Sequence, residues 1–241
     1  MERLILVVGH ESDGGADLWH VSDALPSAVL TPPGPSLQHC VSELRDAGDG
    51  PAVVVPMTWG RDPSMVEETA RTLRWLEPGD EDADVALAEP LGTTDDLVSL
   101  LVAASAQALA AAPAPDSAVV VAARPARPPD DAELYRVAHL VRAESHLPVE
   151  AALLDEPDDL ALAVRRARLL GAGSVTVVPA GFAHALPEAD GIDGVGFHGP
   201  LLDQRALVRL VVRRARGARK RAARGDAADA VDPRGPRPRR R

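Results

Sequence analysis

The sequence predicts an α/β protein made of two similar halves, each with a parallel β-sheet. Short aliphatic runs alternate with longer segments of helical spacing, which is the pattern of βαβ units. The chain also repeats itself: an offset of 123 residues pairs Val41 with Val164 and Gly48 with Gly171. Two similar open sheets, each with a ligand-binding edge, are expected to enclose a cleft.

Eight short runs of aliphatic and branched residues are expected to form the strands, because such runs suit strands covered on both faces. They lie at residues 4–8, 28–31, 52–56, 84–88, 118–122, 149–154, 175–179 and 194–197.

Helical spacing follows most of these runs. Pro63 and Pro157 suit a first helical turn, and Gly48 and Gly171 suit a helix end. Helices are expected at residues 35–47, 63–76, 94–111, 130–145, 157–170 and 203–217, with a shorter one at 16–25.

The repeat divides the chain into an N-terminal half, 1–112, and a C-terminal half, 116–217, joined by an Ala-Pro-Ala-Pro linker. Residues 218–241 are rich in Arg, Pro and Gly and poor in apolar residues, so they are expected to be a disordered basic tail.

Charge and cysteine content narrow the class of protein. Residues 1–202 carry 12 basic and 32 acidic side chains, a net charge of −20, whereas the remaining residues carry +10. The basic tail is the one hint of a nucleic-acid partner, and we expect none. A single cysteine, Cys40, excludes an intrachain disulfide framework. Without an apolar run of about 18 residues or a leader pattern, the protein is expected to be cytoplasmic, with no membrane partner. Nothing indicates an oligomeric state.

Polar residues stand where the strands are expected to end. His10 and Glu11 follow the first strand, Glu89 the fourth, His184 the seventh and His198 the eighth. Parallel sheets bind ligands at this edge. Imidazoles there suit Fe, Co, Ni or Zn, and the two glutamates could add an oxygen ligand or accept protons. Spacing alone fits ordinary packed histidines equally well.

Three common enzyme motifs are absent. The stretch "GHESDGG" departs from the G-x-G-x-x-G dinucleotide loop, and no G-x-x-x-x-G-K-[ST] phosphate loop or G-x-S-x-G nucleophile elbow occurs. Dinucleotide, nucleoside triphosphate and serine-hydrolase chemistry are therefore disfavoured.

Several stretches resemble the class II tetrapyrrole chelatases, specifically the sirohydrochlorin chelatases of cobalamin and sirohaem synthesis. These are "LILVVGHES", "VVVPMTWGRDP", the run from "AELYRVAHL" to "GFAHALP", and the two-fold repeat, together covering about residues 3–217. The resemblance implies two flavodoxin-like halves around a cleft that holds a macrocycle. It also implies insertion of Co²⁺, Fe²⁺ or Ni²⁺ without an organic cofactor.

The resemblance also implies site residues. In that family a histidine in a G-H-G-S motif after the first strand binds the metal; His10 matches it, and Glu11 replaces the second glycine. A second family histidine has no counterpart between residues 56 and 63, but "PAGFAHALP" carries His184 at the pseudo-equivalent place. The implied metal ligands are His10 and His184, with His10 and Glu11 as the catalytic pair that takes up protons.

A flat polycarboxylate substrate would need cations and apolar rings. Arg61, Arg124 and Arg127 are the expected carboxylate clamps, and Trp59 and Phe182 are expected against the macrocycle. The same residues also fit a role without a ligand, in which the arginines are solvated and the aromatic rings pack in the core. The missing histidine keeps a rival open, a non-catalytic relative that binds a metal or tetrapyrrole. An interaction protein that works through its basic tail is a third interpretation.

Overall fold

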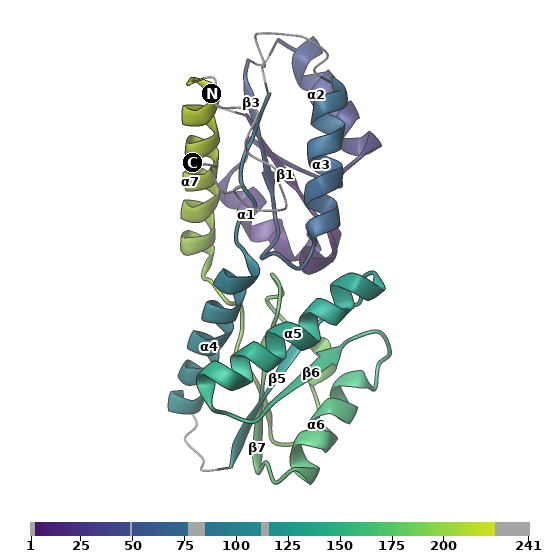
Figure 1. The fold of residues 1–241 in the computed structure, drawn as a ribbon, viewed down its shortest axis with the longest axis vertical. Coiled ribbons are helices and arrows are strands. Elements are labelled where there is room, and N and C mark those ends of the chain that lie inside the picture. Colours follow the sequence, from purple (N-terminus) through teal and green to yellow (C-terminus); the bar gives the residue numbers. More distant parts are fainter. Residues whose placement is uncertain (1–2, 49, 77–84, 112–115, 225–241) are drawn as a thin grey trace, which may run out of the picture.

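Two four-stranded parallel sheets of the same order form the framework, β2-β1-β3-β4 and β6-β5-β7-β8 (Figure 1). The computed structural model describes residues 3–48, 50–76, 85–111 and 116–224. The strands are β1 Arg3–Val7, β2 Ala28–Thr31, β3 Ala52–Pro56, β4 Val85–Leu87, β5 Ser117–Ala123, β6 Val149–Leu153, β7 Ser174–Pro179 and β8 Val195–Phe197. The predicted α/β class and its repeat of two parallel sheets are confirmed.

Helices connect the strands in the expected alternation. They are α1 Trp19–Ala24, α2 Pro35–Asp46, α3 Pro63–Leu76, α4 Thr94–Ala111, α5 Pro128–Ser145, α6 Asp159–Leu169 and α7 Gln204–Ala222, with 3₁₀ segments η1 His10–Leu18 and η2 Pro187–Ala189. No helix within the described ranges is both long enough and apolar enough to cross a membrane.

Each sheet is buried on both faces because its strands carry apolar residues at successive positions. In the N-terminal sheet, Ile5 and Val7 pack with α2 and α3, whereas Leu4 and Leu6 face the opposite layer. This alternation is the period of two expected for a strand. In the C-terminal sheet, α6 covers one face, and α4 and α5 cover the other.

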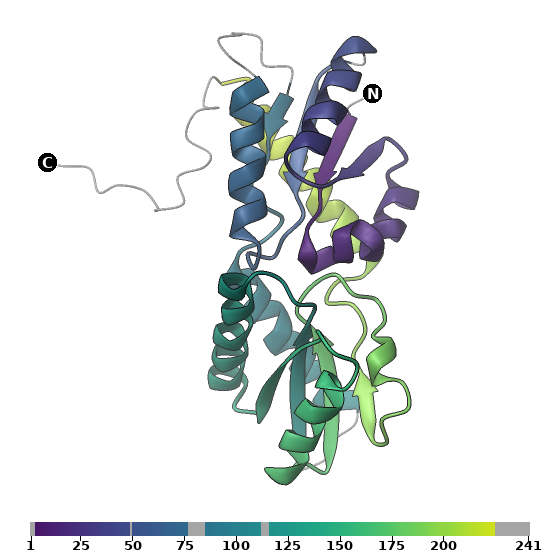
Figure 2. The same cartoon turned by 90° about the vertical axis from the view of Figure 1, so that its right-hand side faces the viewer.

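The last helix of each half covers the sheet of the other half. After β4, α4 crosses over to pack on β5, β7 and α5, and after β8, α7 returns to pack on β3, β4 and α1. Figures 1 and 2 show this exchange, with α7 beside the N-terminal strands and α4 beside the C-terminal ones. The units that pack in space therefore differ from the sequence divisions 1–112 and 116–217.

Two segments differ from the sequence expectation. The chain enters η1 directly after β1, with left-handed backbone at Asp13, Gly14 and Gly15, so the short helix expected at 16–25 begins only at Trp19. At the other end, α7 continues to Ala222 because its Ala, Arg and Lys residues favour a helix. The predicted linker 112–115 and the tail from 225 lie outside the described residues.

Candidate metal and macrocycle site

The carboxyl ends of β1 and β3 meet the carboxyl ends of β5 and β7 at the junction of the halves (Figure 2). Two hydrogen bonds join the edges directly. The Phe182 backbone N–H donates to the Glu11 carbonyl at 2.9 Å, and Arg61 Nη1 donates to the Ala180 carbonyl at 3.0 Å. The expected cleft is thus narrow, with main-chain contacts across it.

His10 stands at this junction, directly after β1, with one ring nitrogen held and the other free. Its Nδ1 lies 3.1 Å from Asp62 Oδ2, and its Nε2 is buried with no hydrogen-bond partner in the described structure. An imidazole that donates from Nδ1 to a carboxylate exposes a lone pair on Nε2, which is the usual arrangement of a metal-binding histidine.

Asp62 is itself fixed by the start of α3. Its Oδ1 accepts a hydrogen bond of 3.0 Å from the Met65 backbone N–H, which caps that helix. Burial alone would raise the pKa of Asp62, but the hydrogen bonds from His10 and Met65 outweigh it, so the pKa lies below its usual value. The carboxylate is therefore charged at neutral pH. Gly9 fits against it, because a Cβ there would overlap Asp62.

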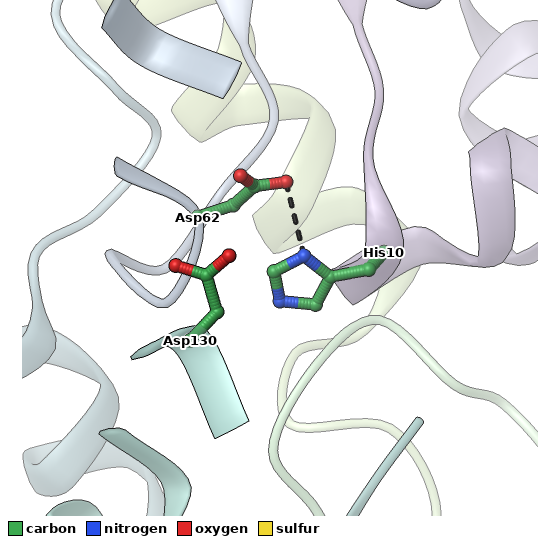
Figure 3. A group of neighbouring side chains, drawn as sticks. All are labelled: His10, Asp62 and Asp130. Atoms are coloured by element: carbon green, nitrogen blue, oxygen red, sulfur yellow. Dashed lines mark ion pairs between the residues drawn. The ribbon is translucent and has the colours of Figure 1, made fainter. Parts of the chain in front are cut away.

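Asp130 completes a group of three possible metal ligands. It lies in the first turn of α5 in the C-terminal half, and its carboxylate, His10 and Asp62 each offer an atom within 4.8 Å of the others. Figure 3 shows the three side chains pointing toward one another from both halves. Among the residues that the structure describes, this is the one such group of three or more.

Sequence reasoning found His10 but missed both aspartates. Each lies near a helix start, where Asp is an ordinary capping residue. A signal for Asp62 was present, since it follows the third strand and the first and third strands of such a sheet are neighbours.

Glu11 is buried and serves the loop after β3. Its carboxylate accepts hydrogen bonds from the Thr58 hydroxyl and from the backbone N–H groups of Trp59 and Arg61, the latter two at 3.0 Å. Burial raises the pKa of Glu11 although the nearby Arg61 guanidinium opposes this shift. With both oxygens engaged, Glu11 holds the residue 58–61 loop in place.

The three predicted arginines lie near the junction with different exposure. Arg61 is 1% exposed, and its Nε and Nη2 have no partner in the described structure. Burial lowers the pKa of Arg61 despite the nearby Glu11. Arg124 Nη2 lies 3.5 Å from Asp13 Oδ2. Arg127 Nη2 lies 3.0 Å from Asp130 Oδ2, and the rest of the Arg127 side chain is exposed.

The two predicted aromatic residues stack on each other. The rings of Trp59 and Phe182 are 5.3 Å apart at 23°, and both side chains are buried. A cavity at the junction, lined by His10, Asp17 and Arg61 among others, has a volume of about 20 Å³. This is room for about one water molecule and far below the roughly 300–1,000 Å³ of ligand pockets.

The structure does not place His184 in the His10 group. His184 Nε2 lies 3.0 Å from His20 Nε2, and the metal-ligating group around His10 contains neither residue. Glu89 and His198 are also engaged elsewhere: Glu89 pairs with Arg214 on α7 at 2.8 Å, and His198 Nε2 lies 3.4 Å from Gln107.

Comparison with known proteins defines the class of fold. The sequence matches no protein-family model and no curated protein sequence. The paired parallel sheets nevertheless resemble those of solved chelatase structures. In particular, the sirohydrochlorin chelatase SirB from Bacillus subtilis subspecies spizizenii, in complex with cobalt, matches with a TM-score of 0.50 and 14% identity over 94% of this chain and 99% of SirB.

Two further structures match. SirB from Bacillus subtilis with Fe³⁺ has a TM-score of 0.52 at 14% identity, again over 94% of this chain and 99% of SirB. A multi-domain protein from Deinococcus radiodurans with structural similarity to chelatases has a TM-score of 0.49 at 15% identity; the match covers 89% of this chain and 54% of that longer protein, so this chain spans about half of it. The two SirB structures confirm the expected resemblance to the chelatase fold.

Proposed function

We propose that this protein is a chelatase of the sirohydrochlorin type that inserts a divalent metal, Co²⁺ or Fe²⁺, into a tetrapyrrole. The observation that carries the proposal is the free, buried Nε2 of His10, whose ring is oriented by Asp62 at the junction of the two sheets. The chelatase-like fold supports it. The reaction is placed in the cytoplasm, in keeping with the single, free Cys40, and uses no organic cofactor.

Metal insertion needs a ligand that holds the incoming ion and then releases it. His10 Nε2 supplies one nitrogen, and Asp130 supplies an oxygen from the facing half. Such a mixed site of few ligands suits a borderline divalent ion that must move on to four pyrrole nitrogens. Asp62 acts through His10, keeping the hydrogen on Nδ1 and the lone pair on Nε2.

Two protons leave the macrocycle as each divalent ion enters it. Asp17 lines the same cavity as His10, and burial raises the pKa of its carboxyl group. A carboxylate with a raised pKa is the better proton acceptor near neutral pH, so we assign one proton to Asp17 and the other to solvent water. Glu11, the acceptor expected from the sequence, is assigned to holding the residue 58–61 loop.

The substrate carboxylates are assigned to the arginines. Arg61 has two free donor groups facing a buried environment, and Arg124 lines the same cavity. Because an unpaired buried cation is costly, a substrate carboxylate that meets Arg61 gains a strong charge-assisted hydrogen bond. Arg127 can join them by leaving Asp130.

Entry of a macrocycle requires the halves to separate. The cavity of about 20 Å³ is far too small for a tetrapyrrole, and the hydrogen bonds from Phe182 to Glu11 and from Arg61 to Ala180 join the two halves beside it. We propose that these contacts break on binding and that Trp59 and Phe182 unstack to lie against the ring.

A second candidate is a non-catalytic relative that binds a metal or tetrapyrrole. The closed junction and the absence of a second histidine from the His10 group favour it.

Insertion of Co²⁺ and Fe²⁺ into sirohydrochlorin, followed by visible absorption, separates the two candidates. We expect His10→Ala to reduce the enzyme-dependent rate to near the spontaneous rate. His39→Ala is the matched control, because His39 lies on the exposed face of α2, 3.3 Å from Glu43. Equal rates for His10→Ala and wild type, in folded protein, would contradict the role of His10.

A further inference from the structure

The outward face of α7 carries a row of basic side chains that the proposed function does not use. Residues 204–224 contain nine basic residues and no acidic one. Five exposed members follow one another at intervals of three or four residues, and we call them the α7 basic row: Arg205, Arg209, Arg213, Arg216 and Lys220. At about 100° per residue, they lie within an arc of about 80° around the helix.

The α7 basic row points away from the body of the protein. The buried side chains of α7 pack toward β3, β4 and α1 from the opposite side of the helix; they are Leu207, Val211, Ala215 and Ala218. Figure 1 shows α7 on one side of the N-terminal strands and α2 and α3 on the other. The exposed acidic residues of α2 and α3, such as Glu43 and Glu67, are therefore separated from the row by the sheet.

Other arginines of α7 fasten the helix to the body. Arg214 Nη1 lies 2.8 Å from Glu89 Oε2, and Arg221 Nη1 lies 3.3 Å from Glu89 Oε1. Arg219 Nη2 donates a hydrogen bond of 2.8 Å to the Pro51 carbonyl. In contrast, no member of the α7 basic row makes an ion pair or a side-chain hydrogen bond with another residue that the structure describes. Its cations are available to a partner.

Helix stability does not account for the α7 basic row. Like charges four residues apart repel each other on a helix, and Arg209 has such a neighbour on each side. Cations near the C-terminus of a helix are favoured by its dipole, which suits Lys220, but Arg205 is the second residue of α7, at the positive end. The row therefore destabilises its own helix, and an anionic partner would remove this repulsion.

We propose that the α7 basic row binds the phosphate backbone of a nucleic-acid duplex without regard to base sequence. From Arg205 to Lys220 the helix rises about 22 Å, which is about two-thirds of one turn of B-DNA. A duplex carries about one negative charge per 1.7 Å of its axis, so phosphates face the row along its whole length. Four of the five side chains are arginines, whose guanidinium groups match phosphate oxygens in pairs.

Other polyanions fit this face less well. A helix that lies on a membrane buries its apolar face in the lipid, but the apolar face of α7 is packed against the protein. Single strands usually stack their bases on aromatic rings, and α7 has none. The expectation of no nucleic-acid partner rested on the tail alone, and the row is a separate observation that favours one.

Salt-dependent binding of the full-length protein to DNA tests the proposal. A labelled duplex of about 20 base pairs, two helical turns, is titrated at 50–200 mM NaCl and followed by fluorescence anisotropy. We expect Arg209→Gln/Arg213→Gln/Arg216→Gln to weaken binding at least about tenfold at 50 mM NaCl. The slope of log affinity against log salt should become shallower by about 2.7, because three phosphate contacts are lost.

Two variants serve as controls. Arg71→Gln/Arg142→Gln/Arg165→Gln removes the same charge from exposed arginines of α3, α5 and α6, and it is expected to keep the wild-type salt slope. Lysine at the three positions of the row keeps the charge and is also expected to keep the slope. Glutamine and lysine are both good helix formers, and circular dichroism verifies that α7 is retained.

Any of four results would overturn the proposal. The first is no binding of the duplex by the wild-type protein at 50 mM NaCl. The second is an unchanged salt slope in the row variant, which would place binding elsewhere in the chain. The third is an equal loss in the control variant, which would show an effect of net charge alone. The fourth is binding to phosphatidylserine vesicles but not to the duplex. None of these results depends on whether the protein inserts metal into a tetrapyrrole.

Discussion

Replacing Asp62 by Asn removes the charged acceptor that orients His10 and preserves the helix cap. Asparagine caps helices as well as aspartate does, so the hydrogen bond to the Met65 N–H is retained and α3 keeps its start. With the amide oxygen on the Met65 N–H, the amide nitrogen takes the place of Oδ2, which lies 3.1 Å from His10 Nδ1 in the wild type. His10 Nδ1 therefore loses both its hydrogen-bond acceptor and the negative charge beside it.

The expected cost is about 10- to 100-fold in affinity for Co²⁺ at the His10 site, the usual effect of removing a carboxylate behind a metal-binding histidine. This equals about 1.4–2.7 kcal/mol. Unfolding free energy should change by less than about 0.5 kcal/mol, because the helix cap remains. Asp62→Ala is the contrasting variant, since it also loses the cap and about 1 kcal/mol of stability.

The assay is a Co²⁺ titration of Asp62→Asn and of the wild-type protein, together with urea denaturation of both. Unchanged Co²⁺ affinity at unchanged stability would refute the reasoning that Asp62 prepares His10 as a ligand. The same affinity loss in His39→Ala, which changes an exposed histidine, would refute it as well.

Three further outcomes follow from the junction. Glu11→Ala should lower the urea-unfolding free energy by at least about 1–3 kcal/mol, because it leaves the buried Thr58 hydroxyl and the backbone N–H groups of Trp59 and Arg61 without their acceptor; unchanged stability would contradict this. Gly181→Ala should cost about 1–3 kcal/mol in the same assay, since its Cβ would lie 2.5 Å from the main-chain oxygen of residue 11, and wild-type stability would show that the halves are not in contact there. Burial lowers the pKa values of His20 and His184 in the folded protein, so the unfolded chain binds those protons more readily. The unfolding free energy should therefore fall as the pH drops from 6.5 through these lower pKa values. Replacing both histidines by Gln should flatten the fall, and an unaltered pH profile would contradict the lowered pKa values.

Local periodicity was enough to predict the framework. The strand runs and the 123-residue offset reflect side chains that alternate between two buried faces, and the sheets have the same order in both halves. The exchange of α4 and α7 was beyond that reasoning. An amphipathic pattern says which face of a helix is buried, but not which sheet it is buried against.

Those residues of the candidate site that lie at strand ends could be predicted from the sequence. His10 follows β1 and was found from that position, whereas Asp130 reaches the site only because the halves face each other. Trp59 and Phe182 were placed correctly at strand ends, but their mutual stacking depends on contacts between residues over a hundred positions apart. His184 was expected beside His10 and pairs with His20 for the same reason.

The most direct test of the account is the rate of Co²⁺ insertion into sirohydrochlorin by the wild-type protein against the spontaneous rate in buffer at the same pH. The account predicts a clear acceleration that saturates with substrate and is also seen with Fe²⁺. Insertion at the spontaneous rate with both metals, by folded protein that binds the macrocycle, would contradict the chelatase function and favour a metal- or tetrapyrrole-binding protein.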